Sequence, residues 1–143
     1  RMTDIHAALG KSQLNRLKEF ISKRQVIANT YFNELVSDNL ILPKQHQDTF
    51  SSYHLFILRF PDKSGPHSRN NAFNRLRESG INVNLHYIPI YRQPYYQDIG
   101  FNIDDFPNSE SYYKMSISLP IYPTLKAEQQ DYVVDTVRFL CDD

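Results

Sequence analysis

A long helical pattern at the start of the chain constrains the fold most. Between residues 3 and 37, apolar side chains recur with a period near 3.6, as in an amphipathic helix. Thr3 and Asp4 suit its start, because a threonine hydroxyl can cap free amides and a carboxylate is favoured at the positive end of the helix dipole. We expect Gly10 to kink or divide this helix.

The length of this helix has a structural consequence. At 1.5 Å per residue, about 35 residues extend roughly 50 Å, which is too long for the rest of a 143-residue chain to cover. We therefore expect the apolar stripe from Leu14 to Leu35 to pack partly against polypeptide outside this chain.

The rest of the sequence alternates between strand-like and helical segments around a polar connection at 38–51. Ser68 is a candidate N-cap, and Gly80 suits the left-handed end of the same short helix. This order predicts an α+β fold. The predicted strands are 53–60, 81–85 and 117–119, the predicted turn after the first strand is 62–65, and the predicted helices are 68–80, 106–115 and 126–140.

Charge and cysteine content exclude several classes of function. Sixteen basic and sixteen acidic residues cancel, so the chain lacks the basic field of nucleic-acid and membrane-surface binders. Cys141 is the only cysteine, which rules out a thiolate metal cluster and fits a reducing compartment such as the cytoplasm. The histidines show no metal-ligand spacing. We expect small molecules or protein subunits as partners, with no nucleic acid, membrane or metal.

The most unusual stretch is "NVNLHYIPIYRQPYYQD", residues 82–98. It places a histidine and four tyrosines directly after a predicted strand, and prolines stiffen the loop that carries them. Tyrosine rings stack on sugars or bases and their hydroxyls form hydrogen bonds, while His86 or Arg92 could contact a phosphate.

A purely structural interpretation of the same residues is also available. Tyrosines at strand ends usually pack a core, and a single histidine there is more often structural than catalytic. No nucleophile elbow, paired carboxylate or glycine-rich phosphate loop accompanies them. On residues alone, the chain is a binding or interface domain without a complete active site, and we assign no catalytic residue.

Several blocks together resemble the DegT/DnrJ/EryC1/StrS sugar aminotransferases. They are "RMTDIHAALGKSQLNRLKEFISKRQVIANTYFNEL", "SSYHLFILRF", "GINVNLHYIPIYRQPYYQDIGF", "FPNSESYYKMSISLPIYPTL" and "EQQDYVVDTV", in this order along almost the whole chain. The resemblance is closest to members that aminate C4 of UDP-linked 4-keto-6-deoxy-N-acetylhexosamines, in pseudaminic acid or bacillosamine biosynthesis.

This resemblance implies a fold and a domain organisation. The chain would be the C-terminal small domain of a fold-type I transferase, with a small, mainly antiparallel sheet and helices on one side. Residues 1–37 would form a helix leading from an absent large domain, and residues 38–143 the small domain. The large domain would carry the Schiff-base lysine for pyridoxal 5'-phosphate (PLP), so this segment alone should bind no cofactor and be inactive.

The resemblance also implies substrates and site residues. Glutamate would donate the amino group to the nucleotide-linked 4-keto sugar, in a homodimer with its active sites at the subunit boundary. The substrate-pocket residues implied by the HYIP block are His86, Tyr87, Ile88 and Pro89, and Tyr91 is a further candidate where many relatives carry histidine. Arg1 is implied to lie near the neighbouring subunit's cofactor. The alternative is a non-catalytic sugar-nucleotide-binding or protein-interaction module of the same fold.

Overall fold

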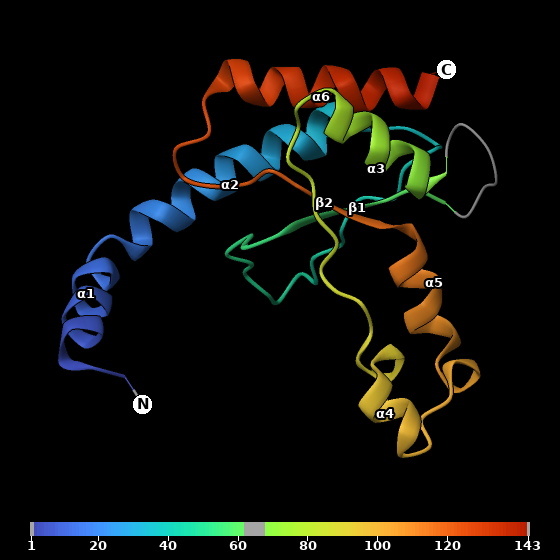
Figure 1. The fold of residues 1–143 in the computed structure, drawn as a ribbon. Coiled ribbons are helices and arrows are strands. Elements are labelled where there is room, and N and C mark those ends of the chain that lie inside the picture. Colours follow the sequence, from blue (N-terminus) through green and yellow to red (C-terminus); the bar gives the residue numbers. More distant parts are fainter. Residues whose placement is uncertain (1, 62–67, 143) are drawn as a thin grey trace.

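The computed structural model describes residues 2–61 and 68–142. Arg1 and the turn predicted at 62–65 fall outside these residues. The chain folds into α-helices and strands, and the strands form a small sheet (Figure 1). In chain order they are α1 (Asp4–Leu14), α2 (Leu17–Glu34), β1 (Phe56–Arg59), α3 (Arg69–Glu78), α4 (Pro94–Asp98), α5 (Pro107–Met115), β2 (Ser116–Leu119) and α6 (Ala127–Asp142), with 3-10 turns at Ile90–Arg92 (η1) and Ile103–Asp105 (η2).

The sheet consists of β1 and β2 paired antiparallel, and its two faces differ in chemistry. Phe56 lies opposite Leu119 and Leu58 opposite Ile117, and all four side chains are buried. Residues on the other face alternate with these along each strand. That second face carries Ile57, Arg59, Ser116 and Ser118.

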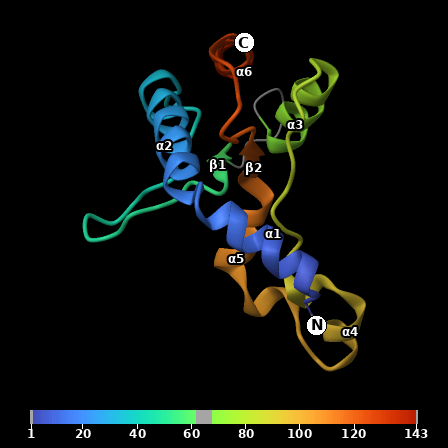
Figure 2. The ribbon, with the colours of Figure 1, turned by 90° about the vertical axis from the view of Figure 1, so that its left-hand side faces the viewer.

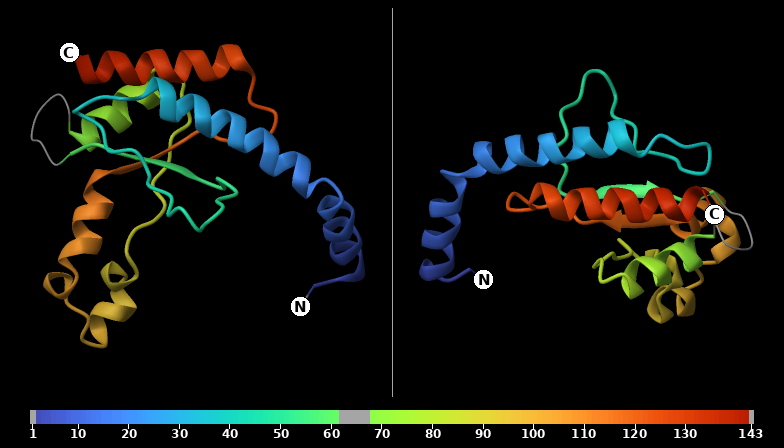
Figure 3. Two further views of the ribbon diagram at one scale, coloured as in Figure 1. Left: turned by 180° about the vertical axis from the view of Figure 1, so that it is seen from behind. Right: turned by 90° about the horizontal axis from the view of Figure 1, so that it is seen from above.

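Helices α2, α3 and α6 contribute the apolar side chains that cover the first face. Tyr31 of α2 packs its ring 5.0 Å from Phe56 and donates its hydroxyl to the Pro120 carbonyl at 2.8 Å. Leu76 of α3 and Val137 of α6 are fully buried in the same cluster. The three helices lie together beside the sheet (Figure 3), so the predicted α+β arrangement with helices on one side is confirmed.

The N-terminal helix is divided, but not at the predicted place. Gly10 lies inside α1, and the break falls at Asn15 and Arg16, between α1 and α2. Thr3 caps α1 as predicted, its hydroxyl accepting the His6 amide. Gly10 has open space around it, so nothing packs against it to impose a bend. Beyond the break, α1 projects away from the body (Figures 1 and 2).

The apolar stripe from Leu14 to Leu35 is only half available to an outside partner. Ile27, Ala28, Tyr31 and Leu35 are buried in this chain's own core, so the expectation was wrong for the second half of α2. None of the residues of α1 is buried in the described structure. Large apolar side chains instead remain exposed over α1 and the start of α2: Met2, Ile5, Leu9, Leu14 and Leu17.

Strand boundaries differ more from the sequence prediction than helix boundaries do. The strand predicted at 53–60 begins only at Phe56, since Tyr53 has a positive φ of 44°. The strand predicted at 81–85 is reduced to one bridge between Asn84 and Ser118. By contrast, Ser68 caps α3 and Gly80 follows it with a φ of 75°, as predicted.

Candidate functional site

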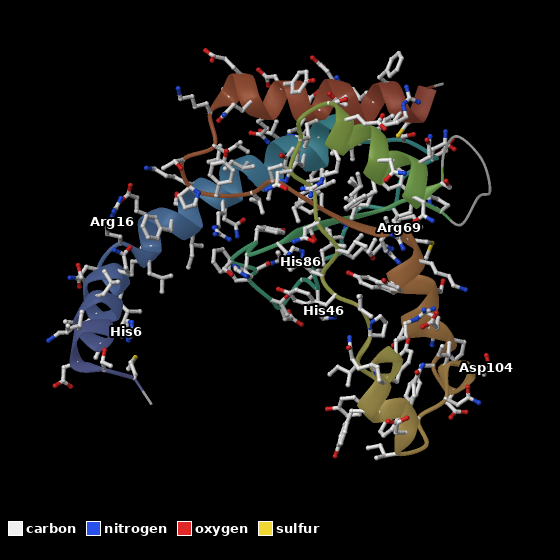
Figure 4. The ribbon with its side chains drawn as sticks, viewed as in Figure 1. His6, Arg16, His46, Arg69, His86 and Asp104 are labelled. Atoms are coloured by element: carbon white, nitrogen blue, oxygen red, sulfur yellow. The ribbon has the colours of Figure 1, made fainter. Side chains whose placement is uncertain are left out.

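The segment that carries the HYIP block is attached to the outer edge of β2, next to the polar face of the sheet. The Ser118 amide donates to the Asn84 carbonyl at 2.8 Å, and the Asn84 amide donates back to the Ser118 carbonyl at 3.4 Å. Two residues on, His86 Nδ1 forms a 2.8 Å hydrogen bond with the Ser118 hydroxyl. His86 therefore lies beside β2 (Figure 4), held there by Ser118 and half-buried.

Tyr87 and Ile88 follow His86 and are exposed to solvent. Tyr87 is 74% exposed and Ile88 is 52% exposed, although both carry large apolar surfaces. They line a groove of about 390 Å³ with the amides of Asn84 and Gln93. The groove therefore combines rings and aliphatic surface with amide donors and acceptors, a combination suited to a sugar or a nucleoside. Its remaining walls are Phe73, Leu85 and Tyr113.

Tyr91 faces inward, unlike Tyr87. It is 7% exposed, and its ring stacks on Phe106 at 4.3 Å and an interplanar angle of 9°. Within the described part of the chain, its buried hydroxyl has no partner in hydrogen-bonding geometry. Burial and, after it, the neighbouring Glu110 carboxylate raise the pKa of Tyr91, so the ring stays neutral at physiological pH. The fold does not place Tyr91 on the same open surface as Tyr87.

Arg92 is held by Glu110 and is not free to receive a phosphate as the sequence suggested. Its Nε donates to one carboxylate oxygen at 2.7 Å and its Nη2 to the other at 2.5 Å. Such a bidentate pair fixes distance and orientation together. Glu110 is 7% exposed, and its hydrogen bonds to Arg92 lower its pKa from 4.5 to about 2 despite the opposing effect of burial.

Ser118 and Glu110 are the contact partners in this region that sequence reasoning missed. A serine in a predicted strand and a glutamate in the first turns of a predicted helix are ordinary residues in ordinary places. Only the partners supplied by the fold, His86 and Arg92, give them a role. The alternation Ser116–Ile117–Ser118–Leu119 was the available signal, because it predicts one polar face.

Neither a metal-ligand cluster nor a membrane-spanning helix is found in residues 2–61 and 68–142. No cluster of three or more His, Cys, Asp or Glu side chains there could hold a metal ion. In the same residues, no helix combines the length and the apolar character needed to cross a bilayer.

The family follows from a match over nearly the whole chain. Residues 1–138 match the model of the DegT/DnrJ/EryC1/StrS aminotransferase family. The chain belongs to this family. Members of the family use PLP, and a candidate sugar aminotransferase from Streptococcus pneumoniae, solved in its PLP form, superposes on 99% of this chain with a TM-score of 0.89 and 29% identity.

Two curated relatives show how much of a longer protein this chain spans. The chain is 37% identical to the spore coat polysaccharide biosynthesis protein SpsC of Bacillus subtilis, over 96% of the chain and 36% of that protein. It is 31% identical to the UDP-4-amino-4,6-dideoxy-N-acetyl-beta-L-altrosamine transaminase of Campylobacter jejuni, with the same coverage. The Streptococcus pneumoniae structure is likewise covered over 36% of its length. The chain thus spans about a third of the length of these relatives.

Proposed function

We propose that this family member is the C-terminal part of a PLP-dependent enzyme that transfers an amino group to a nucleotide-linked sugar. The substrate we favour is a UDP-linked 4-keto-6-deoxy sugar aminated at C4, with glutamate as donor. The name of the Campylobacter jejuni relative supports this choice, since it describes a UDP-linked 4-amino-4,6-dideoxy sugar.

The observation that carries the proposal is the exposure of Tyr87 and Ile88 in a largely apolar groove that also contains Asn84 and Gln93. Exposing this much aromatic and aliphatic surface to water is unfavourable unless something covers it. A sugar nucleotide would cover it, because sugar C–H faces stack on rings and its hydroxyls pair with amides. We assign Tyr87 and Ile88, which line the groove, to direct contact with this substrate, and their neighbours His86 and Pro89 to the border of the same pocket. For Tyr91, which is buried, we propose support of the pocket in place of direct contact.

The reactive chemistry would come from polypeptide outside this chain. When bound, PLP supplies an electron sink that stabilises negative charge at the amino-bearing carbon. We place its lysine and most of its phosphate ligands in the absent large domain, and we keep Arg1 as a residue near the cofactor of a partner subunit. Residues 1–37 would be the connecting helix, and residues 38–143 the small domain that closes the sugar side of the site.

The exposed side of α1 supports this division. Ile5 is 82% exposed and Leu9 is 59% exposed, one helical turn apart and therefore on one face. We propose that the absent large domain and a second subunit cover this face in a homodimer.

The experiment uses the full-length parent and the substitution His86→Ala. We expect the KM for a UDP-linked 4-keto sugar to rise about tenfold, equivalent to roughly 1.4 kcal/mol, while the PLP absorbance is unchanged because His86 does not hold the cofactor. His54→Ala is the matched control, since His54 is an exposed histidine on the segment before β1, and it should leave the KM unchanged. Loss of PLP absorbance at unchanged KM would contradict the proposed role. A parent that binds UDP-sugars but no PLP would favour the non-catalytic module.

A further inference from the structure

The accessible residues Tyr87 and Ile88 lie between two attachments to one structural unit. Helix α5 ends at Met115 and β2 begins at Ser116, so the two elements form one continuous stretch of chain. The first attachment is to β2, through the Asn84 bridge and the His86–Ser118 hydrogen bond. The second is to α5, through Arg92 and Glu110.

The second attachment is a more buried ion pair than the exposed pairs elsewhere in the described chain. Two parallel hydrogen bonds join Arg92 to Glu110, and the Glu110 side chain is only 9% exposed. Solvent and salt therefore screen this pair less than an exposed one. Next to it, the Tyr91 ring stacks on Phe106, just before α5. This stacking adds packing between the segment and α5.

The turn between Pro89 and Arg92 links the attachment on α5 to the accessible residues Tyr87 and Ile88. The Arg92 amide donates to the Pro89 carbonyl at 3.0 Å, which closes the 3-10 turn η1. Fixing Arg92 on α5 therefore fixes Pro89, three residues back. Tyr87 and Ile88 are then held between Pro89 on one side and His86 on the other, although their own side chains are exposed.

We propose that Arg92 and Glu110 are positioning residues that hold Tyr87 and Ile88 in place for the nucleotide-linked sugar. This inference rests on the proposed function. The pair does not touch the substrate; it sets where the ring and the aliphatic side chain meet it. Displacement of a contact group by about 1 Å can cost on the order of 100-fold in rate or binding, so loss of the pair has a measurable effect on substrate use.

The test uses the full-length PLP-loaded parent with Glu110→Gln and Arg92→Met. Both variants should raise the KM for a UDP-linked 4-keto sugar by about 10- to 100-fold. The change in PLP absorbance on adding the amino donor alone should keep its rate, because that half-reaction does not use the Tyr87 surface. Arg92→Lys keeps the charge but loses the bidentate geometry, and should give an intermediate KM.

A second ion pair provides the matched control. Arg138 on α6 contacts Glu34 on α2 at 2.6 Å, with both side chains nearly half exposed. Arg138→Met removes the same type of contact away from the groove and should leave the KM unchanged.

The outcomes separate this inference from the proposed function. An unchanged KM in Glu110→Gln and Arg92→Met, with a saturable wild type, would overturn the positioning role alone. Equal losses in both half-reactions, together with a lower Tm, would also overturn it and show a purely structural pair. A wild-type parent with no saturable dependence on nucleotide-linked keto sugars would overturn both proposals.

Discussion

His86 and Ser118 are joined across 32 positions of sequence by a 2.8 Å hydrogen bond between the imidazole Nδ1 and the serine hydroxyl. The serine lies on the polar face of β2, and its backbone pairs with Asn84 on the same segment. One residue of the strand thus sets both the path of the segment and the orientation of the ring. The position of the proposed pocket is therefore determined by the sheet.

Ser118→Ala should weaken substrate binding without unfolding the protein. The His86 ring loses its partner but is only half-buried, so it can turn towards water at a cost of about 1 kcal/mol. We expect a several-fold higher KM for the nucleotide sugar in the full-length parent, and a small decrease in the free energy of unfolding.

Ser116→Ala is the control for this substitution. Ser116 lies on the same strand and face and is equally buried, but its hydroxyl donates to the Tyr112 carbonyl at 2.6 Å. A KM change as large as that of Ser118→Ala would show that any polar loss on this face disturbs the segment.

Local signals in the sequence predicted the ends of α3 and the start of α5, although they missed α4 and misplaced the break between α1 and α2. Ser68 and Gly80 mark the ends of α3 because a serine side chain and a glycine with positive φ satisfy different requirements of helix termini. Pro107 begins α5 for a similar reason, since its missing amide costs nothing in the first turn. These effects act within a few residues and can be read from one segment.

The features that the sequence did not predict depend on contacts between residues far apart in the chain. The alternation at 81–85 is that of a strand, but the chain makes only one bridge there, through Asn84. Nothing local distinguishes Tyr87, which is exposed, from Tyr91, which stacks on Phe106 from another segment. The assignment of the HYIP block to a pocket comes from the family resemblance and stays a prediction, whereas its two attachments depend on contacts between distant residues.

Phe56→Ala tests the core that supports the sheet. Phe56 is fully buried and packs on Tyr31 and Phe32, so its truncation leaves a cavity and should cost about 3–5 kcal/mol of unfolding free energy. Urea denaturation of the full-length parent measures this value. Phe139→Ala serves as the comparison, because Phe139 is 57% exposed with Arg75 over its ring, and we expect a loss below about 1 kcal/mol. Equal losses would contradict the core assignment.

Glu110 should make stability depend on pH in the acid range. Its pKa is about 2 in the folded chain against an ordinary value of 4.5, so the folded state favours the ionised carboxylate. The stabilisation is fully present above pH 4.5 and is lost as pH falls towards 2, because the unfolded state takes up the proton first. Urea midpoints between pH 6 and 2.5 should fall less steeply for Glu110→Gln than for the wild type. Parallel curves for the two proteins would exclude this contribution.

Ile5→Glu tests what covers α1. Ile5 makes no buried contact within the described chain, being 82% exposed, so a carboxylate there costs the small domain itself almost nothing. In the full-length parent, the same change would bury a charge against the large domain or the second subunit, which is unfavourable without a partner. We expect a lower Tm and a shift from dimer to monomer in light scattering after size exclusion. Gln13→Glu adds the same charge at an exposed polar position of α1 and should leave both unchanged. If Ile5→Glu behaves like Gln13→Glu, α1 is free in the parent, and the helix does not join this domain to anything else.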